Sequence, residues 1–172
     1  MFVAFASVEE ILDLRQRVLR PGQPRESALT DVDLLPDTFH LAARTDSGEL
    51  GACATFSTEP LPDTPALAPF PAEGVWRLRK LASDPTVRGQ GFGKAVLAAG
   101  LDACAARGGR LVWCSGRLAA AGFYRHHGFT AVGDQYTVPG IGQHHHFVHT
   151  LPSSRDSQPV PGAGRASAAD PC

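Results

Sequence analysis

The spacing of apolar residues predicts a helix close to the start of the chain. In the segment SVEEILDLRQRVLR, Ser7 and Glu10 have the spacing of a capping box. In this motif the side chain of each residue accepts a hydrogen bond from the backbone N–H of the other. The positions that follow the helical repeat are Val8, Ile11, Leu12, Arg15, Val18 and Leu19. Pro21 and Gly22 end the pattern, so a helix is expected over about 7–20.

Short apolar runs separated by turn residues predict strands, with two further helical repeats among them. Strands are expected over 38–44, 50–56, 75–83, 110–115, 130–133 and 144–151. Helices are expected over 91–107 and 117–129. The turn between the first two strands contains Gly48, which can adopt a positive φ. Strands that alternate with helices predict a mixed α/β sheet with at least one crossover connection.

Composition is typical of one globular domain, because 172 residues with 43% hydrophobic and 19% charged side chains can bury a sizeable core. Residues 152–172 carry almost no large apolar side chain, so we expect a domain over 1–151 and a disordered tail. A net charge of −1 gives no support for a nucleic-acid or membrane partner. The four cysteines lack metal or redox spacing, and residues 1–10 lack a leader pattern, so we expect a cytoplasmic protein.

The segment VRGQGFGK, residues 87–94, lies between a predicted strand and a predicted helix. Its three glycines allow either a tight turn or a close approach of backbone N–H groups to a phosphate at the positive end of the helix. The segment lacks the spacing of a Walker loop, since Lys94 is followed by Ala95, and its glycines do not match the dinucleotide fingerprint. Glycine content alone leaves both possibilities open.

A wider pattern around this loop resembles the GNAT superfamily of N-acetyltransferases. The run from Arg88 to Gly93 resembles that family's (Arg/Gln)-x-x-Gly-x-(Gly/Ala) signature. Further along, FYRHHGF resembles the family's second motif, in which a tyrosine, here Tyr124, lies four residues before a Gly-Phe pair, here Gly128 and Phe129. The resemblance covers roughly residues 5–151. It implies an α/β fold with a mostly antiparallel central sheet, splayed middle strands and flanking helices.

The resemblance implies that the loop binds the pyrophosphate of acetyl-CoA, the co-substrate of this family. By residue match, the backbone N–H groups that would do so belong to Arg88, Gly89, Gln90, Gly91, Phe92, Gly93 and Lys94. The strand before the loop would pair with the pantetheine arm through Leu81 and Ser83. An N–H near Leu81 or Ala82 would meet the negative charge that develops on the thioester oxygen. Arg117 stands where the family often has an asparagine that contacts pantetheine, so it is also a candidate cofactor contact.

The resemblance assigns Tyr124 as the proton donor to the departing thiolate. The resemblance assigns no general base in strand 75–83, because many relatives carry a glutamate there, whereas this strand holds cations and no acid. Its Arg77 and Arg79 either lie on a solvated face or receive a substrate that bears a carboxylate or phosphate. Arg15, on the first helix, is a further candidate substrate contact.

Histidine offers an alternative base. Strand alternation places His144 and His146 on one face, and His145 and His149 on the other. His144 resembles a histidine that enters this strand in part of the family, and histidine is a workable base at neutral pH. No acid or cysteine nearby completes a metal site, so none is expected.

Two functions from different classes follow from these observations. The first is an enzyme that transfers an acetyl group from acetyl-CoA to a primary amine of a small molecule or protein, by direct attack in a ternary complex. The second is a catalytically silent module that binds acyl-CoA. This alternative stays open because strand 75–83 has no glutamate and Arg117 replaces the asparagine common in the family. A homodimer is possible in either case.

Overall fold

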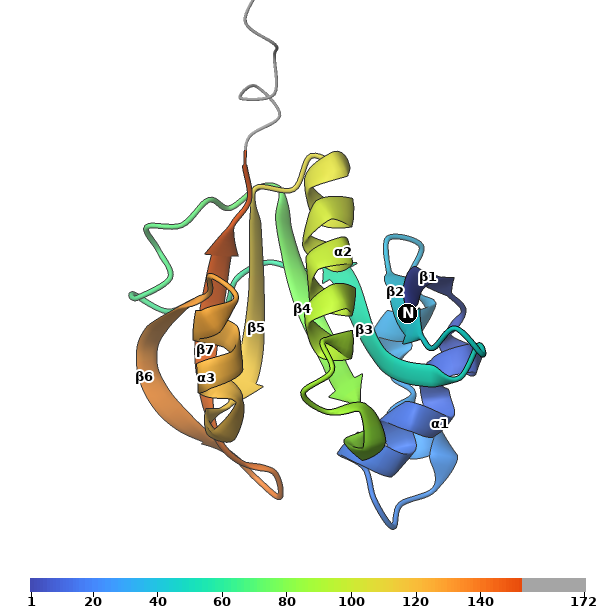
Figure 1. The fold of residues 1–172 in the computed structure, drawn as a ribbon. Helices are drawn as coiled ribbons and strands as arrows, with labels where there is room; N and C mark the ends of the chain where they lie inside the picture. The colour runs from blue at the N-terminus through green and yellow to red at the C-terminus, as the bar shows by residue number, and fades with distance from the viewer. Residues whose placement is uncertain (153–172) are drawn as a thin grey trace, which may run out of the picture.

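The computed structural model describes residues 1–152. These residues form one seven-stranded sheet in the order β1-β2-β3-β4-β5-β7-β6 with three α-helices (Figure 1). The strands are β1 (Phe2–Ala6), β2 (Phe39–Arg44), β3 (Leu50–Thr58), β4 (Val75–Ser83), β5 (Leu111–Arg117), β6 (Thr130–Val138) and β7 (Gly142–Thr150). The helices are α1 (Val8–Leu19), α2 (Phe92–Ala106) and α3 (Ala121–His126). The predicted tail, residues 152–172, lies outside the described residues except for Pro152.

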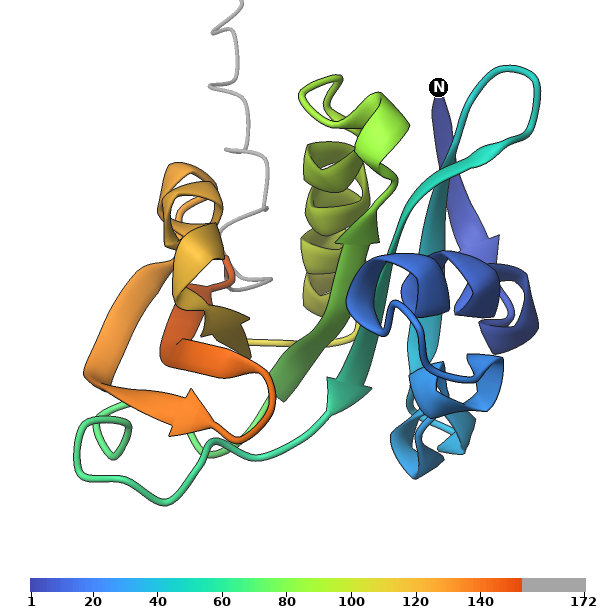
Figure 2. The same cartoon turned by 90° about the horizontal axis from the view of Figure 1, so that it is seen from below.

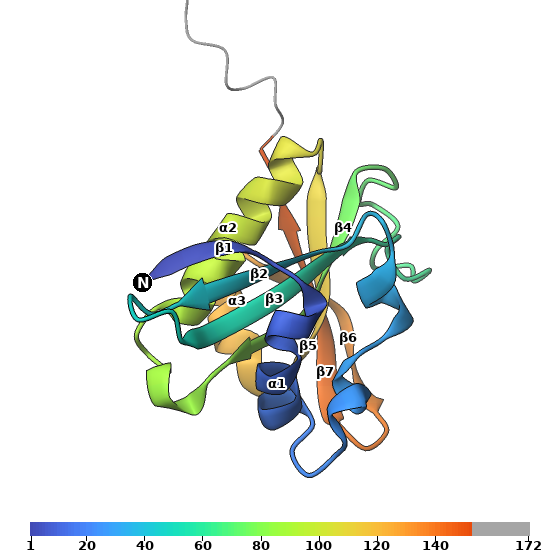
Figure 3. The ribbon, with the colours of Figure 1, turned by 90° about the vertical axis from the view of Figure 1, so that its right-hand side faces the viewer.

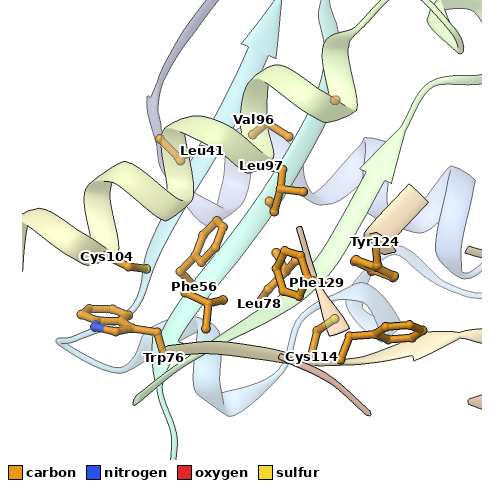
Figure 4. Close-up of a cluster of buried hydrophobic side chains, with 14 of the residues drawn as sticks. Leu41, Phe56, Trp76, Leu78, Val96, Leu97, Cys104, Cys114, Tyr124 and Phe129 are labelled. Atoms are coloured by element: carbon orange, nitrogen blue, oxygen red, sulfur yellow. The ribbon is translucent and has the colours of Figure 1, made fainter. Parts of the chain in front are cut away.

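The helices cover both faces of the sheet, with α2 and α3 on one face and α1 on the other (Figure 2). The larger core lies under α2 and α3, where aliphatic side chains of the helix meet aromatic side chains of the strands (Figure 4). Its central members include Phe56, Trp76, Leu78, Val96, Leu97, Tyr124 and Phe129. A smaller core beneath α1 joins Ile11 and Leu14 to Ala42, Cys53 and Ala82. Among the described residues, no helix is long and apolar enough to cross a membrane.

Helix α1 begins where the sequence predicts. The Glu10 carboxylate accepts a hydrogen bond from the Ser7 backbone N–H at 2.8 Å, and the Ser7 hydroxyl accepts one from the Glu10 N–H. The capping box is therefore confirmed, and α1 runs from it to a C-terminal cap residue, Arg20.

The two middle strands separate along their length. β4 and β5 are parallel and joined by α2, but they pair only where Val75–Arg77 lies beside residues 111–113. Beyond this point they diverge (Figure 1), so the facing edges of Leu81–Ser83 and residues 115–117 have no partner strand in the described sheet. The predicted splayed strands are confirmed. An unpaired strand edge can accept an extended ligand as an added strand.

The sheet is strongly twisted. In the side view, β2 and β3 run across the picture, whereas β5 and β7 run from bottom to top (Figure 3). A β-bulge in β4 contributes to this twist: Cys53 pairs with Ala82 and Thr55 with Arg79, which leaves two residues of β4 opposite one residue of β3. Lys80 lies in the bulge with a φ of 52°, a left-handed value that a non-glycine residue adopts only at a cost. The sequence carries no turn signal at this position.

Three elements of the structure differ most from the sequence prediction. β1 was not predicted, because its FVAFA run is short and lacks a clear alternation of apolar and polar residues. The predicted helix 117–129 is limited to Ala121–His126, because Arg117 still pairs with His144 in the sheet. The predicted strand 130–133 continues to Val138, past a register shift between Val132 and Tyr136.

A buried ionic network holds the bulge and α1 together. Arg15 and Asp33 have fully buried side chains, and the Arg15 guanidinium lies 2.9 Å from the Asp33 carboxylate. The Lys80 ammonium bonds to the other oxygen of Asp33, to the Thr30 hydroxyl and to the Ala28 carbonyl. Burial raises the pKa of Asp33, but the hydrogen bond from Lys80, the charge of Arg15 and the hydrogen bond from the Thr30 N–H outweigh it and lower that pKa to about 2.

We expect Asp33→Asn to lower the free energy of unfolding by about 3 kcal/mol at pH 7, because two buried cations lose their counter-charge. The folded pKa lies below the ordinary value near 3.9, so the network stabilises the fold above about pH 4 and this contribution is lost as pH falls toward 2. Urea unfolding should therefore show a parent–variant difference that narrows over this range. Asp31→Asn, an exposed change in the same 3-10 helix, is the control. An equal loss in both variants would contradict the role of the network.

Candidate active site

The glycine loop presents free backbone donors at the start of α2. Gly91 is the N-terminal cap residue, with a φ of 86°, and no side chain caps the helix. The first N–H groups of α2, on Phe92, Gly93 and Lys94, have no acceptor within the helix. A Cβ built on Gly91 would meet no atom within 4 Å, so the loop surface is open. These N–H groups and the helix dipole together favour an anion.

This loop borders a cleft of about 740 Å³ between α2, α3 and the edge of β4. No acidic side chain is among the described residues that line it, whereas Arg88, Lys94 and Arg117 contribute positive charge. Of the expected cofactor contacts, the cleft is lined by Leu81, Ser83, Arg88, Gly89, Gly91, Phe92, Gly93, Lys94 and Arg117. Ala82 and Gln90 do not line it: Ala82 is buried beneath α1, and the Gln90 N–H donates to the Val87 carbonyl at 3.2 Å.

Tyr124 lies where α3 meets the separated strands. Its ring stacks on Phe147 with centroids 5.0 Å apart, and it fits against β5 because a Cβ on Gly116 would come within 2.6 Å of the ring. Burial, together with the neighbouring Cys114 thiol, raises the pKa of Tyr124 well above its usual value. The hydroxyl therefore keeps its proton at neutral pH. The sequence offered no sign that Gly116 makes room for this ring.

A second cavity, of about 270 Å³, lies on the α1 side of the sheet. We call it the acceptor cavity. It shares the lining residues Leu81, Arg117, Ala120 and Tyr124 with the cleft at the glycine loop. The two spaces therefore adjoin at the point where β4 and β5 separate. A molecule in the cleft and a molecule in the acceptor cavity would meet at Tyr124.

His144 lines the acceptor cavity and is 7% exposed. Its Nδ1 lies 2.9 Å from the Gly142 carbonyl oxygen. Since a carbonyl can only accept, Nδ1 carries the hydrogen, and Nε2 of the neutral ring is left as a proton acceptor. The structure thus brings His144 and Tyr124 to one cavity from β7 and α3.

His146 is on the same face of β7, as the strand alternation predicts, but it does not line the acceptor cavity. Its ring packs against Tyr136 with centroids 4.7 Å apart and against Trp113. Burial and the charge of Arg77 lower the pKa of His146.

Arg77 and Arg79 do not line either space. Both bind the carboxylate of Glu59, which follows β3: Arg77 at 3.0 Å, and Arg79 through two hydrogen bonds of 2.6 Å. Burial raises the pKa of Glu59, but the hydrogen bonds from Arg79, Ser57 and Arg77 lower it to about 2. Both arginines are therefore bound to one carboxylate of the protein, away from the two spaces. Glu59 was not identified from the sequence, because it is distant along the chain from its partners.

Arg15 does line the acceptor cavity, but its guanidinium is already bonded to Asp33, His40 and Thr55. Arg20, Ser115 and Ile141 also line this cavity and were not identified from the sequence. They lie at the end of α1, in β5 and in the turn before β7, and only the fold brings them together. No local motif marks any of them.

Comparison with known proteins is consistent with this geometry. The sequence model described as "Acetyltransferase (GNAT) family" matches residues 7–129. The uncharacterized N-acetyltransferase YitI of Bacillus subtilis is 33% identical to this chain over 150 residues, covering 87% of this chain and 95% of that protein.

Solved structures show the same fold. The crystal structure of Escherichia coli ElaA has a TM-score of 0.66 with 19% identity, covering 86% of this chain and 99% of ElaA. An acyl-CoA N-acyltransferase from Pseudomonas aeruginosa has a TM-score of 0.64 with 22% identity, covering 86% of this chain and 97% of that structure. At these identities the likeness establishes the fold alone.

Proposed function

Because the chain belongs to the acetyltransferase (GNAT) family, we propose that it transfers the acetyl group of acetyl-CoA directly to a primary amine while both substrates are bound. The observation that carries this mechanism is the shared wall of the two spaces, where Tyr124 and Leu81 border both the cleft and the acceptor cavity. One substrate can therefore reach the other through the gap between β4 and β5. We place the activity in the cytoplasm, which the free thiols of the described cysteines support.

The cleft fits coenzyme A in three respects. The uncapped N–H groups around Gly91 suit a pyrophosphate. The exposed side chains of Arg88 and Lys94 supply positive charge for phosphate groups. The unpaired edge of β4 at Leu81–Ser83 can accept the amide groups of the pantetheine arm as an added strand.

His144 and Tyr124 would then handle the two protons of the reaction. The amine nitrogen attacks the thioester carbon, the carbon–sulfur bond breaks, and the sulfur leaves as a thiolate. His144 Nε2 takes the proton that the amine gives up, directly or through a water molecule. The Tyr124 hydroxyl would give its proton to the thiolate, and a backbone N–H near Leu81, which lines the cleft, would stabilise the carbonyl oxygen.

The decisive experiment measures release of the CoA thiol, and mass of the acetylated product, over a panel of small primary amines. Turnover that depends on both acetyl-CoA and an amine supports the enzyme. Tight binding of acetyl-CoA without transfer to any amine would instead favour a silent acyl-CoA-binding module.

We expect Gly91→Ala to weaken acetyl-CoA binding by about tenfold or more, because an alanine is strained at a φ of 86° and the loop must shift its N–H groups. Isothermal titration of acetyl-CoA measures the effect. The matched control is Gly48→Ala, at a φ of 91° in the turn between β2 and β3, where a Cβ also meets no atom within 4 Å. Both variants should lose similar stability, but only Gly91→Ala should lose affinity. Unchanged affinity in folded Gly91→Ala would remove the loop from the site.

A further inference from the structure

The acceptor cavity has an unusual balance of charge. Its lining includes Arg15, Arg20, Lys80 and Arg117, and none of the described residues that line it is an aspartate or glutamate. Arg15 and Lys80 share the single carboxylate of Asp33, which lies behind the wall. Arg20 and Arg117 form no ion pair among residues 1–152. The cavity therefore carries excess positive charge.

Arg20 is the free cation that belongs to this cavity alone, because Arg117 also borders the cleft for acetyl-CoA. It is half-buried at the end of α1, where its backbone N–H donates to the Gln16 carbonyl at 2.9 Å. The helix end thus holds the backbone of Arg20 in place. Its guanidinium makes no hydrogen bond to another described residue, so its donors are available to a ligand.

We propose that the acceptor of the acetyl group is a small amino acid-like molecule, with a carboxylate that binds Arg20 and a primary amine that is acetylated. This inference rests on the proposed function and names the chemistry of its second substrate. A guanidinium presents paired donors that match the two oxygens of a carboxylate. With the carboxylate on Arg20, the amine has the rest of the cavity in which to approach His144 and Tyr124.

Charge and size both favour this class of acceptor. A diamine or polyamine would bring further positive charge to a wall that already holds unmatched cations. A cavity of about 270 Å³ is at the lower limit of ligand sites, which suits a small molecule. The sequence suggested Arg77 and Arg79 as the residues that bind a substrate carboxylate. Because both are paired with Glu59, we assign that binding to Arg20 instead.

The test compares acceptors that differ only in charge. The α-amino acids, β-alanine and 4-aminobutyrate are assayed beside their carboxamides and beside 1,4-diaminobutane, with the parent protein, Arg20→Gln and Arg20→Lys. The control is Arg110→Gln, which removes an exposed arginine at the opposite end of β5. Circular dichroism and the melting temperature verify that each variant is folded.

We expect at least one acid to have a kcat/KM tenfold or more above that of its carboxamide. Arg20→Gln should lower kcat/KM for the acid by about 10- to 100-fold and leave the carboxamide nearly unchanged, since the lost interaction is a charge-assisted hydrogen bond. Arg20→Lys should retain part of the preference for the acid over its carboxamide, and Arg110→Gln should retain all of it. Transfer that favours carboxamides or the diamine, or an equal loss on acid and carboxamide in Arg20→Gln, would overturn the inference and leave the transferase intact.

Absence of transfer to any amine would instead count against the proposed function. In that case the same acids and carboxamides are titrated into the CoA-saturated protein by calorimetry. Binding that requires the carboxylate and is lost in Arg20→Gln would support a carboxylate site at Arg20. Absence of such binding would overturn the inference that Arg20 binds a carboxylate.

Discussion

Tyr124→Phe is expected to lower kcat by about 10²–10⁴, because it removes the proton donor to the thiolate and leaves the ring in place. The ring packs on Phe147 and Phe129, and neither contact involves the hydroxyl. Affinity for acetyl-CoA and the melting temperature should therefore change little. Steady-state kinetics on an accepted amine, together with titration of acetyl-CoA, separates the chemical step from binding.

Tyr136→Phe is a matched control, since it deletes the only other tyrosine hydroxyl of the chain. That hydroxyl bonds to Ser115, and Tyr136 itself does not line the acceptor cavity. We expect a change in kcat of less than about tenfold, as for a residue outside the proton transfer. A parent-like rate in Tyr124→Phe would mean that water or another group protonates the thiolate.

His144→Gln is expected to lower kcat/KM by about 10²–10⁴, because the amine loses its proton acceptor. Glutamine is of similar size and keeps a donor that can reach the Gly142 carbonyl, so the turn before β7 should persist. The base must be unprotonated to act, so kcat/KM of the parent should rise with pH. Since burial keeps Tyr124 protonated, that tyrosine should add no fall in rate up to about pH 10.

The rise with pH should disappear in His144→Gln and remain in His146→Gln. His146 shares the face of β7 but lies outside the acceptor cavity, which makes its variant a close control. The reverse result would assign the base to His146, acting through an ordered water. A rise that survives in both variants would place the base on the substrate or on another residue.

Features that depend on neighbours in the chain were predictable from the sequence. The Ser7–Glu10 cap, the bounds of β4 and the open glycine loop at the start of α2 all follow from short-range hydrogen bonding and φ preferences. The order of strands and helices further predicted a mixed sheet with at least one crossover, which the structure places between β4 and β5. The family motif then assigned Tyr124 and the loop to one site, and the structure places both on one cleft.

Features that depend on residues distant in the chain were decided only by the tertiary structure. Arg77 and Arg79 read as free cations in strand 75–83, yet the fold sets Glu59 against both of them. Conversely, Arg20 reads as an ordinary helix-end residue, yet the fold places it in the acceptor cavity without an acidic partner among the described residues. Sequence determines which charges a chain carries. Because a Coulomb interaction depends on distance and burial, only the folded arrangement determines which of those charges are matched within the protein and which remain for a ligand.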